Sequence, residues 1–315
     1  MNITKNRRYW FGCSLALLTA SIISVLYFGF NLGLDFTGGA RWHVDFSQEQ
    51  TTEESESWVL GESSEEVSTE SLNAFFAGLE NLEKAPLIQA SGNGEFLITI
   101  EDMSDSELQA IAEGVRTSVG DFEEISYRKV DSSIGASFKR KAMYSIIAAL
   151  VGIILFVAWA FRKVPAVINP WRFGGVAIAA LFHDVLIILG IFVWMGALRD
   201  VELDLPFITA LLATLGFSVN DTIVILDRVR ENIRLQKAHE TFEDTVENSV
   251  QQTLMRSINT SISTLLPLVA LLIWGANSIF FFVLALTIGI VIGTYSSIFL
   301  AAPLLVTWKK WGDRK

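Results

Sequence analysis

The side chains best suited to do chemistry in this sequence are polar groups inside apolar segments. Asp221, with Asn220 beside it, lies within the apolar run from Leu205 to Leu226. At about 1.5 Å per helical residue, this run can cross a hydrocarbon core of roughly 30 Å. A carboxylate at that depth has a high free energy unless it faces other helices or water and has a partner. The position favours a functional acid, and the alternative is a buried acid that only joins helices.

Helical spacing puts several polar residues on the face that carries Asp221. The residues that recur there every three or four positions are Thr214, Ser218, Asp221, Ile225 and Arg228. A later apolar segment has a second polar face, which ends near Pro267 and consists of Arg256, Asn259, Thr260 and Ser263. Because both faces begin at the same predicted depth, we expect Asp221 and Arg256 to form a buried pair. In the alternative, Arg256 extends toward lipid phosphates.

A second candidate site consists of the neighbours His183 and Asp184, near the middle of the apolar segment from Phe173 to Met195. An unperturbed histidine titrates near pH ~6.5, so an imidazole beside a carboxylate could relay protons. The two side chains could equally join neighbouring helices by hydrogen bonds. The sequence leaves both interpretations open.

Other kinds of chemistry find no support in the sequence. It has no Walker-type phosphate loop, no zinc-ligand spacing and no serine or cysteine nucleophile signature. The three histidines are scattered, so we expect no metal site, and the single cysteine, Cys13, can form no disulfide within the chain. We therefore predict a protein that is not an enzyme and needs no cofactor. Work on a substrate would draw on protons that move down a transmembrane gradient.

The elements that must position these residues are long apolar segments. Hydrophobic residues make up 51% of the chain and the mean hydropathy is +0.43, which is too apolar for a single soluble domain. Six candidate spans lie near residues 11–30, 143–161, 173–195, 205–226, 258–274 and 279–308. The first span has no small-residue cleavage site after it, so we expect it to stay uncleaved. The predicted fold class is a polytopic α-helical membrane protein with six transmembrane helices and one external α+β domain between the first two.

The basic residues predict the orientation of the spans. With the N-terminus inside, most bases flank the inner ends of the spans, whereas the two short outer loops contain only Arg199. The positive-inside rule then puts both termini in the cytoplasm and the long loop outside. Lys139, Arg140 and Lys141 would lie outside, but they end a long loop, and such loops cross the membrane largely regardless of charge. A polar segment at about 230–255 is expected to be an amphipathic cytoplasmic helix within the 140–315 bundle.

The external domain is expected at 32–139, after the first span at 1–31. Residues 32–141 contain 22 of the 34 acidic residues but only 8 of the 24 basic residues, which argues against nucleic-acid binding. Alternation and helical periodicity predict strands at 41–46, 96–100 and 122–130 and helices at 69–82 and 104–119. Helix starts are expected at Ser68 or Thr69, with Ser71, and at Ser104, with Glu107. The acid-rich stretch 47–68 is expected to be a flexible excursion.

Several motifs resemble the SecD/SecF family of the RND superfamily. One span, a large external domain and five further spans are similar to half of an RND-type transporter. The segment Gly33-Leu34-Asp35-Phe36-Thr37-Gly38-Gly39 resembles the family motif after the first span. The stretches that resemble the SecF branch rather than the SecD branch are 216–222, 227–232, 183–185 and 252–257.

The resemblance implies an accessory subunit of the Sec protein translocase in the bacterial cytoplasmic (inner) membrane. SecD would supply the other six spans and SecYEG the channel, with YajC a further candidate partner beside exported polypeptides and membrane lipids. In that family the residues that match Asp221 and Arg256 are linked to proton transport, so the expected proton pathway comprises Asp221, Arg256, Asn220 and Ser218. Residues of the family motifs, expected to be structural, are Gly33, Asp35, Gly38, Gly39, Asp227 and Arg228. Two alternatives stay open: half of a small-molecule or lipid exporter, and a passive scaffold for SecD and the channel.

Overall fold

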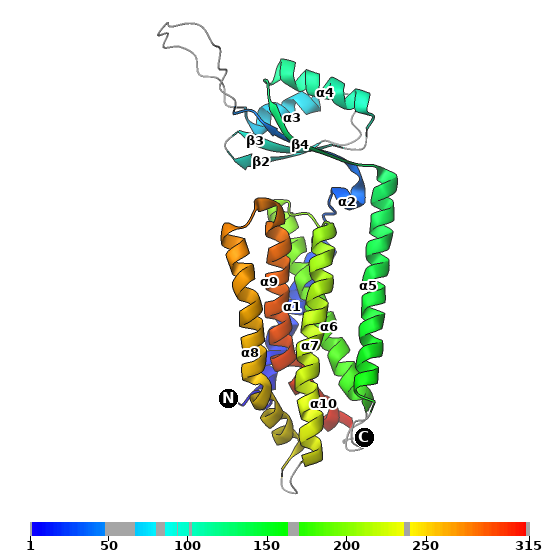
Figure 1. Cartoon of the computed structure of the whole chain (residues 1–315), viewed down its shortest axis with the longest axis vertical. Coiled ribbons are helices and arrows are strands. Elements are labelled where there is room, and N and C mark those ends of the chain that lie inside the picture. The colour runs from blue at the N-terminus through cyan, green and yellow to red at the C-terminus, as the bar shows by residue number, and fades with distance from the viewer. Residues whose placement is uncertain are drawn as a thin grey trace, which may run out of the picture. The chain divides into compact units, whose positions relative to one another are not determined.

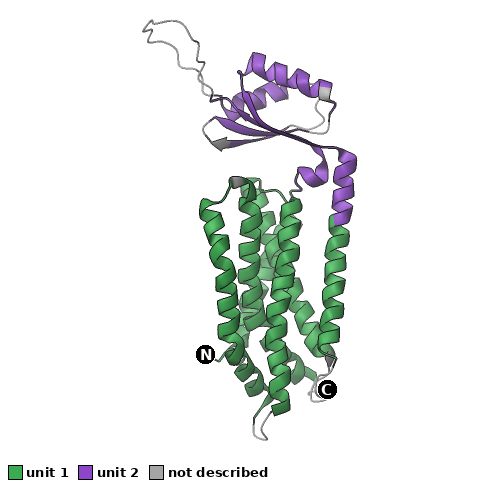
Figure 2. Cartoon of the chain, in the orientation of Figure 1, with its two compact units in different colours: residues 1–31, 142–315 green, residues 32–141 purple. Residues whose placement is uncertain are grey.

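The computed structural model describes residues 2–47, 67–79, 86–92, 94–100, 103–162, 170–235 and 240–312. The chain divides into two compact units, residues 1–31 with 142–315 and residues 32–141, which Figure 2 distinguishes by colour. We call them the membrane unit and the soluble unit. The acid-rich stretch predicted at 47–68 falls almost wholly outside the described residues.

The predicted fold class is confirmed. Within the described residues, six helical runs are long and apolar enough to cross a membrane. They are α1 (Arg7–Phe28), α5 (Ser132–Ala160), α6 (Pro170–Arg199), α7 (Leu205–Leu235), α8 (Phe242–Trp274) and the run that begins with α9 (Phe280–Tyr295) (Figure 1). After α9 the same run continues through a π-helical turn, η2 (Ser296–Ala301), into α10 (Ala302–Gly312).

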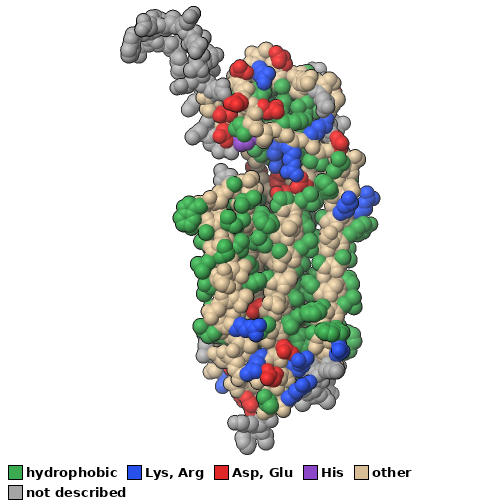
Figure 3. Space-filling view, viewed as in Figure 1, with side chains coloured by type: hydrophobic (Ala, Val, Ile, Leu, Met, Phe, Trp, Pro, Cys, Tyr) green, Lys and Arg blue, Asp and Glu red, His purple; other side chains and the backbone are tan. Residues whose placement is uncertain are grey.

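The membrane unit has an apolar outer surface and a partly polar interior. The large apolar side chains of Leu26 and Trp274 are 81% and 80% exposed. Such exposure suits contact with lipid rather than with water. Hydrophobic side chains cover most of the helical surface seen in Figure 3, and charged side chains gather where α7 ends and α8 begins. Helix α7 packs against α6, α8 and α9 and is therefore central to the unit.

Two glycines of α9 let this helix come close to α7. A Cβ atom added at Gly289 would lie 2.3 Å from Cγ2 of Thr214, and one added at Gly293 would lie 2.9 Å from Cβ of Ser218. Small residues at such positions are typical of membrane helices whose backbones approach closely. The contact brings α9 directly onto the polar face of α7.

The soluble unit is an antiparallel sheet with two helices. Its strands are β1 (Gly39–Asp45), β2 (Leu87–Gly92), β3 (Glu95–Ile100) and β4 (Glu123–Val130), in the order β2-β3-β1-β4. Its main helices are α3 (Thr69–Ala77) and α4 (Asp105–Ser118), and a short α2 (Leu34–Thr37) precedes β1. Trp42 of β1 lies opposite Ile98 of β3 and Tyr127 of β4. Alternate residues such as Trp42, Phe96 and Ile98 are buried in the core of this unit.

The sequence-based predictions for this unit are largely confirmed. Capping boxes mark both helix starts, at Ser68 with Ser71 and at Ser104 with Glu107. The predicted helix at 69–82 ends at Ala77, and its last predicted residues lie outside the described range. Strand β2 was not predicted, although the Asn93-Gly94 dipeptide that follows it is a strong hairpin signal. The sheet therefore contains one strand more than expected.

The polar segment at about 230–255 is not a separate amphipathic helix. It is divided between the end of α7, at Leu235, and the beginning of α8, at Phe242, with 236–239 outside the described residues. A capping box of Thr241 with Asp244 starts α8 at this point. The cap satisfies free backbone N–H groups in the first turn of α8, so a separate helix begins here.

Candidate functional site

Asp221 lies on the buried face of α7, as the helical spacing predicts. Thr214, Ser218 and Ile225 on the same face are also buried. The hydroxyl of Ser257 on α8 donates a hydrogen bond to Oδ1 of Asp221 at 2.5 Å. The other carboxylate oxygen, Oδ2, is buried and has no hydrogen-bond partner among the described residues. One oxygen of this acid is therefore bound by a neutral donor and the other is unpaired.

The expected buried pair of Asp221 with Arg256 is not present within the described part of the chain. Arg256 is exposed and forms no ion pair with a described residue, although it is close enough to Asp221 to interact electrostatically. The physical reason is the rotation of α8, which turns Ser257 toward α7 and the preceding residue away from it. Asn220, also predicted for the pathway, is exposed beside Asp221.

The predicted polar face of α8 is likewise turned outward. Its members Asn259, Thr260 and Ser263 are exposed, like Arg256. Polar side chains at membrane depth are stable only against protein or water. This surface, Arg256, Asn259, Thr260 and Ser263, is called the α8 polar face below.

Asp184 is the second buried acid of the bundle, and it lies between three elements. Its Oδ2 accepts hydrogen bonds from the hydroxyl of Ser218 on α7 at 2.5 Å and from the hydroxyl of Ser296 in η2 at 2.7 Å. Its Oδ1 lies 2.9 Å from Nδ1 of His183. The histidine ring stacks against Tyr295 with 6.3 Å between ring centroids. Asp184 thus joins α6, α7 and η2 through hydrogen bonds.

The π-helical turn brings two consecutive serines into the interior. Ser296 and Ser297 are both fully buried. Ser296 contacts Asp184, whereas Oγ of Ser297 lies 2.8 Å from Oγ1 of Thr222, the residue after Asp221. π-helical turns of this kind occur frequently at functional sites. The turn is therefore the element that contacts the surroundings of both acids.

Other predicted residues lie away from these acids. Asp227 is ion-paired with Arg230 at 2.5 Å, and Arg228 contacts Glu231 at 2.6 Å and Gln252 at 2.5 Å, near the end of α7. The two ion pairs lie within α7, and only the bond from Arg228 to Gln252 connects α7 to α8, so the structural role expected for Asp227 and Arg228 stays a prediction.

The glycine motif lies in the soluble unit, in and beside α2. Gly38 and Gly39 have φ of +76° and +123°, a region that favours glycine, and a Cβ on Gly38 would lie 2.7 Å from the Cα of Ser132. Gly33 is the N-cap residue of α2. Asp35, buried in α2, is ion-paired with Arg128 of β4 at 2.8 Å. The motif therefore fixes the turn that leads into β1.

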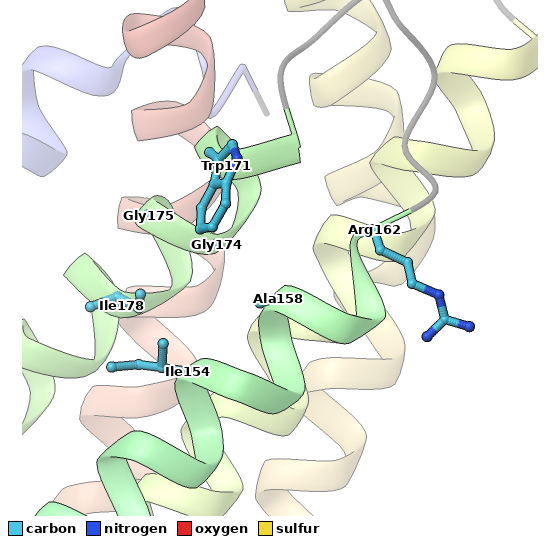
Figure 4. A pocket seen from close by; sticks show the side chains of 7 residues that line it. All are labelled: Ile154, Ala158, Arg162, Trp171, Gly174, Gly175 and Ile178. Atoms are coloured by element: carbon cyan, nitrogen blue, oxygen red, sulfur yellow. The ribbon is translucent and has the colours of Figure 1, made fainter.

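A hollow of the membrane unit lies away from both acids. A groove of about 390 Å³ between α5 and α6 is lined by Ile154, Ala158, Arg162, Trp171, Gly174, Gly175 and Ile178 (Figure 4). Its lining is mainly apolar, and the guanidinium of Arg162 points away from Trp171. It shares no residue with the two acids or their hydrogen-bond partners. Within the described residues, no group of three or more His, Cys, Asp or Glu is placed to hold a metal ion.

Sequence reasoning missed the hydroxyl partners of both acids. These are Ser257 on α8, which donates to Asp221, and Ser296 in η2, which donates to Asp184. A signal was available, because serines in apolar spans seek hydrogen-bond partners on neighbouring helices. Which acid each serine would contact depends on the rotation and separation of the helices.

Comparisons with known proteins agree with this architecture. The family model described as "Protein export membrane protein SecD/SecF, C-terminal" matches residues 110–311, and the model for the SecD/SecF GG motif matches residues 24–41. A protein translocase subunit SecF from Thermobaculum terrenum is 38% identical over 98% of this chain and 94% of that protein. A SecF protein from Sebaldella termitidis is 31% identical over 99% of this chain and 92% of that protein.

Longer relatives contain a SecD part as well. A SecDF protein of Bacillus subtilis is 34% identical over 98% of this chain, which covers 38% of that protein. The crystal structure of SecDF from Thermus thermophilus, a translocon-associated membrane protein, matches with a TM-score of 0.81 and 32% identity, covering 98% of this chain and 39% of that chain. Because the family model matches most of the chain and SecF proteins match nearly all of it, the chain belongs to the SecF branch of the SecD/SecF family of protein-export membrane proteins.

Proposed function

We propose that this chain, together with SecD, uses the transmembrane proton gradient to promote late steps of protein export, with Asp221 as the group that binds and releases the proton. The observation that carries the proposal is the half-satisfied carboxylate of Asp221, bound by Ser257 through one oxygen and unpaired at the other. A hydroxyl can donate to a carboxylate and can accept from a carboxylic acid, so Ser257 suits either form. The unpaired oxygen is the atom to which a proton can be added.

The gradient can supply enough energy for such a cycle. One charge that crosses the membrane releases about 2.3 kcal/mol per 100 mV. A proton can shift a conformational equilibrium only if the two conformations bind it with different affinity. Arg256 provides such a difference if it approaches Asp221 in one conformation and leaves it in the other. Its exposed position, within electrostatic range of the acid, is compatible with this movement.

The α8 polar face supports SecD as the partner. Four polar residues exposed at span depth need protein or water against them. The fused SecDF relatives carry a SecD part in the same chain, so a second set of spans accompanies the first in those proteins. We infer that SecD covers the α8 polar face and Asn220. SecYEG, YajC and the emerging polypeptide are the further partners that this function requires.

The proposed location is the bacterial inner membrane with both termini in the cytoplasm. The basic residues support this orientation, because they flank the helix ends on the side of both termini. The soluble unit then lies outside, where it can hold emerging polypeptide and oppose its return.

Secretion in cells that carry Asp221→Asn at wild-type protein levels tests the proposal. The amide still accepts the Ser257 hydrogen bond but cannot be ionised. We therefore expect the rate of export to fall at least tenfold, a change equivalent to about 1.4 kcal/mol. The matched control is Asp227→Asn, the same change at an exposed, ion-paired acid of the same helix. Unimpaired export with Asp221→Asn would remove this acid from the mechanism.

The two rival functions give different results. A passive scaffold predicts that Asp221→Asn alters only co-purification with SecD and leaves proton flux unchanged. A small-molecule or lipid exporter predicts that deletion of the chain blocks efflux of a solute while protein secretion continues. Proton uptake by vesicles that contain this chain and SecD, with and without sodium, would also identify the coupling ion.

A further inference from the structure

Asp184 is held in a way that differs from Asp221. Two hydroxyls from other elements, Ser218 on α7 and Ser296 in η2, donate to the same oxygen of Asp184, at 2.5 Å and 2.7 Å. The second oxygen faces His183. Asp184 is 2% exposed, so water does not compete for these bonds. This geometry is that of an acceptor that joins helices.

The two elements held by Asp184 also surround Asp221. Ser218 precedes Asp221 by three residues, so it lies on the same face of α7. Ser297, next to Ser296 in the π-helical turn, contacts Thr222 at 2.8 Å and lies within interaction range of the Asp221 carboxylate. A shift of the turn away from Asp184 would therefore change the groups around Asp221.

We propose that Asp184 is a positioning residue: by accepting hydrogen bonds from Ser218 and Ser296, it holds the π-helical turn against α7 and so sets the hydrogen-bond environment of Asp221. The inference rests on the proposed function of Asp221 and deepens it. It also chooses between the two interpretations of this pair that the sequence leaves open. Asp184 acts as a hydrogen-bond acceptor, and its ability to carry a proton is not required.

Two substitutions of Asp184 distinguish its role as a hydrogen-bond acceptor from a role as a proton carrier. Asp184→Asn keeps a carbonyl oxygen that can accept from both serines, but it cannot be ionised. Asp184→Ala removes the acceptor and leaves two buried hydroxyls without it. A positioning role therefore predicts that the asparagine variant works and the alanine variant fails.

The experiment uses the full chain with SecD in proteoliposomes under an imposed proton gradient, with proton entry followed by a pH-sensitive dye at several external pH values. Asp184→Ala should lower proton entry about tenfold and move its pH midpoint by about one unit, as expected for a tenfold change in proton affinity at Asp221. Asp184→Asn should retain the wild-type midpoint and rate within about twofold. Among the described residues, the titratable or charged groups around the two acids are His183 beside Asp184, Tyr295 stacked on His183, and Arg256 within electrostatic range of Asp221.

Serine variants keep the test decisive if Asp184→Ala does not fold. Ser296→Ala removes one donor from Asp184 and should move the midpoint in the same direction by a smaller amount. The matched control is Ser249→Ala, which removes a buried hydroxyl of α8 that accepts a hydrogen bond from Asn232 of α7 at 2.9 Å. This control should leave the midpoint unchanged.

The possible outcomes are distinct. If Asp184→Asn is as defective as Asp221→Asn, Asp184 carries a proton itself and the positioning role is overturned. If Ser296→Ala and any folded Asp184→Ala protein keep the wild-type midpoint, Asp184 only stabilises the fold and the inference also fails. If the wild-type chain shows no proton entry that depends on Asp221, the proposed function fails instead.

Discussion

The soluble unit and the membrane unit bury acidic side chains in opposite ways. In the soluble unit, the side chain of Asp35 is 3% exposed and pairs with Arg128, whose own side chain is 65% exposed. In the membrane unit, Asp221 contacts a serine, and Asp184 contacts two serines and a histidine. No arginine or lysine in the described residues forms an ion pair with either membrane acid.

The difference follows from what surrounds each unit. Arg128 can neutralise Asp35 at little cost because most of its guanidinium remains in water. Within a bundle, a base would need further hydrogen-bond partners of its own, whereas a serine hydroxyl can bond either form of the acid. An ion pair holds an acid in one charge state, and a hydroxyl environment allows it to change. The comparison therefore indicates a stabilising ion pair at Asp35 and is compatible with the proton exchange that we propose for Asp221.

The largest effect is expected from a substitution that separates α9 from α7. It tests whether the serine contacts of the two membrane acids depend on the close packing of these helices. Gly289→Val would put a Cβ 2.3 Å from the side chain of Thr214, so the helices must separate. We expect a loss of about 3 kcal/mol or more in the free energy of unfolding, at the upper end for overpacked sites. Thermal unfolding of the purified protein in detergent measures it. Gly152→Val on α5 is the matched control, because no atom lies within 4 Å of an added Cβ there. Equal stability of the two variants would contradict the packing argument.

A medium effect is expected at the ion pair of the soluble unit. Asp35→Asn replaces a charge-assisted bond to Arg128 by a neutral one, so we expect the free energy of local opening to fall by about 1.5–3 kcal/mol. Hydrogen exchange of the β1 and β4 amides in the full chain reports this change. The same replacement at Asp221 should leave hydrogen exchange in α7 nearly unchanged, because Ser257 can still donate to the amide oxygen. A larger change in hydrogen exchange for Asp221→Asn than for Asp35→Asn would contradict the proposed difference between the two units.

The smallest expected effect concerns an exposed acid of the soluble unit. Hydrogen bonds from Ser104 hold the pKa of Glu107 below its usual value of 4.5. Because the pKa is lower in the folded protein, the stabilisation is present above the unfolded pKa and is lost as the pH falls through the folded pKa. Ser104→Ala removes the N-cap of α4 and should cost about 1 kcal/mol.

Hydrogen exchange of the α4 amides at neutral and acidic pH checks this prediction. The wild-type chain should lose protection of the first turn of α4 at acidic pH, and Ser104→Ala should have lost it already at neutral pH. Ser118→Ala, at the other end of α4, is the control and should behave as wild type. Unchanged protection in Ser104→Ala would show that the cap does not stabilise this helix.

Local patterns in the sequence determined much of the architecture. The spans, the buried face with Thr214, Ser218 and Asp221, and the helix starts at Ser68, one of two candidates, and at Ser104 were predicted. Each depends on residues within a few positions of one another, whose side chains share a helix face or a helix end whatever the rest of the chain does. Strand β2 could have been found in the same way from the Asn93-Gly94 dipeptide in the sequence.

Only the tertiary structure decided which groups contact the two acids. Arg256 and Ser257 are adjacent in sequence, and the rotation of α8 alone turns the serine inward and the arginine outward. Ser296 and Ser297 reach the interior because the helix widens into a π-helical turn and because glycines of α9 let it approach α7. Hydrogen bonds between helices need a specific rotation and separation of both partners, and these arise from packing across the whole bundle rather than from the spacing within one segment.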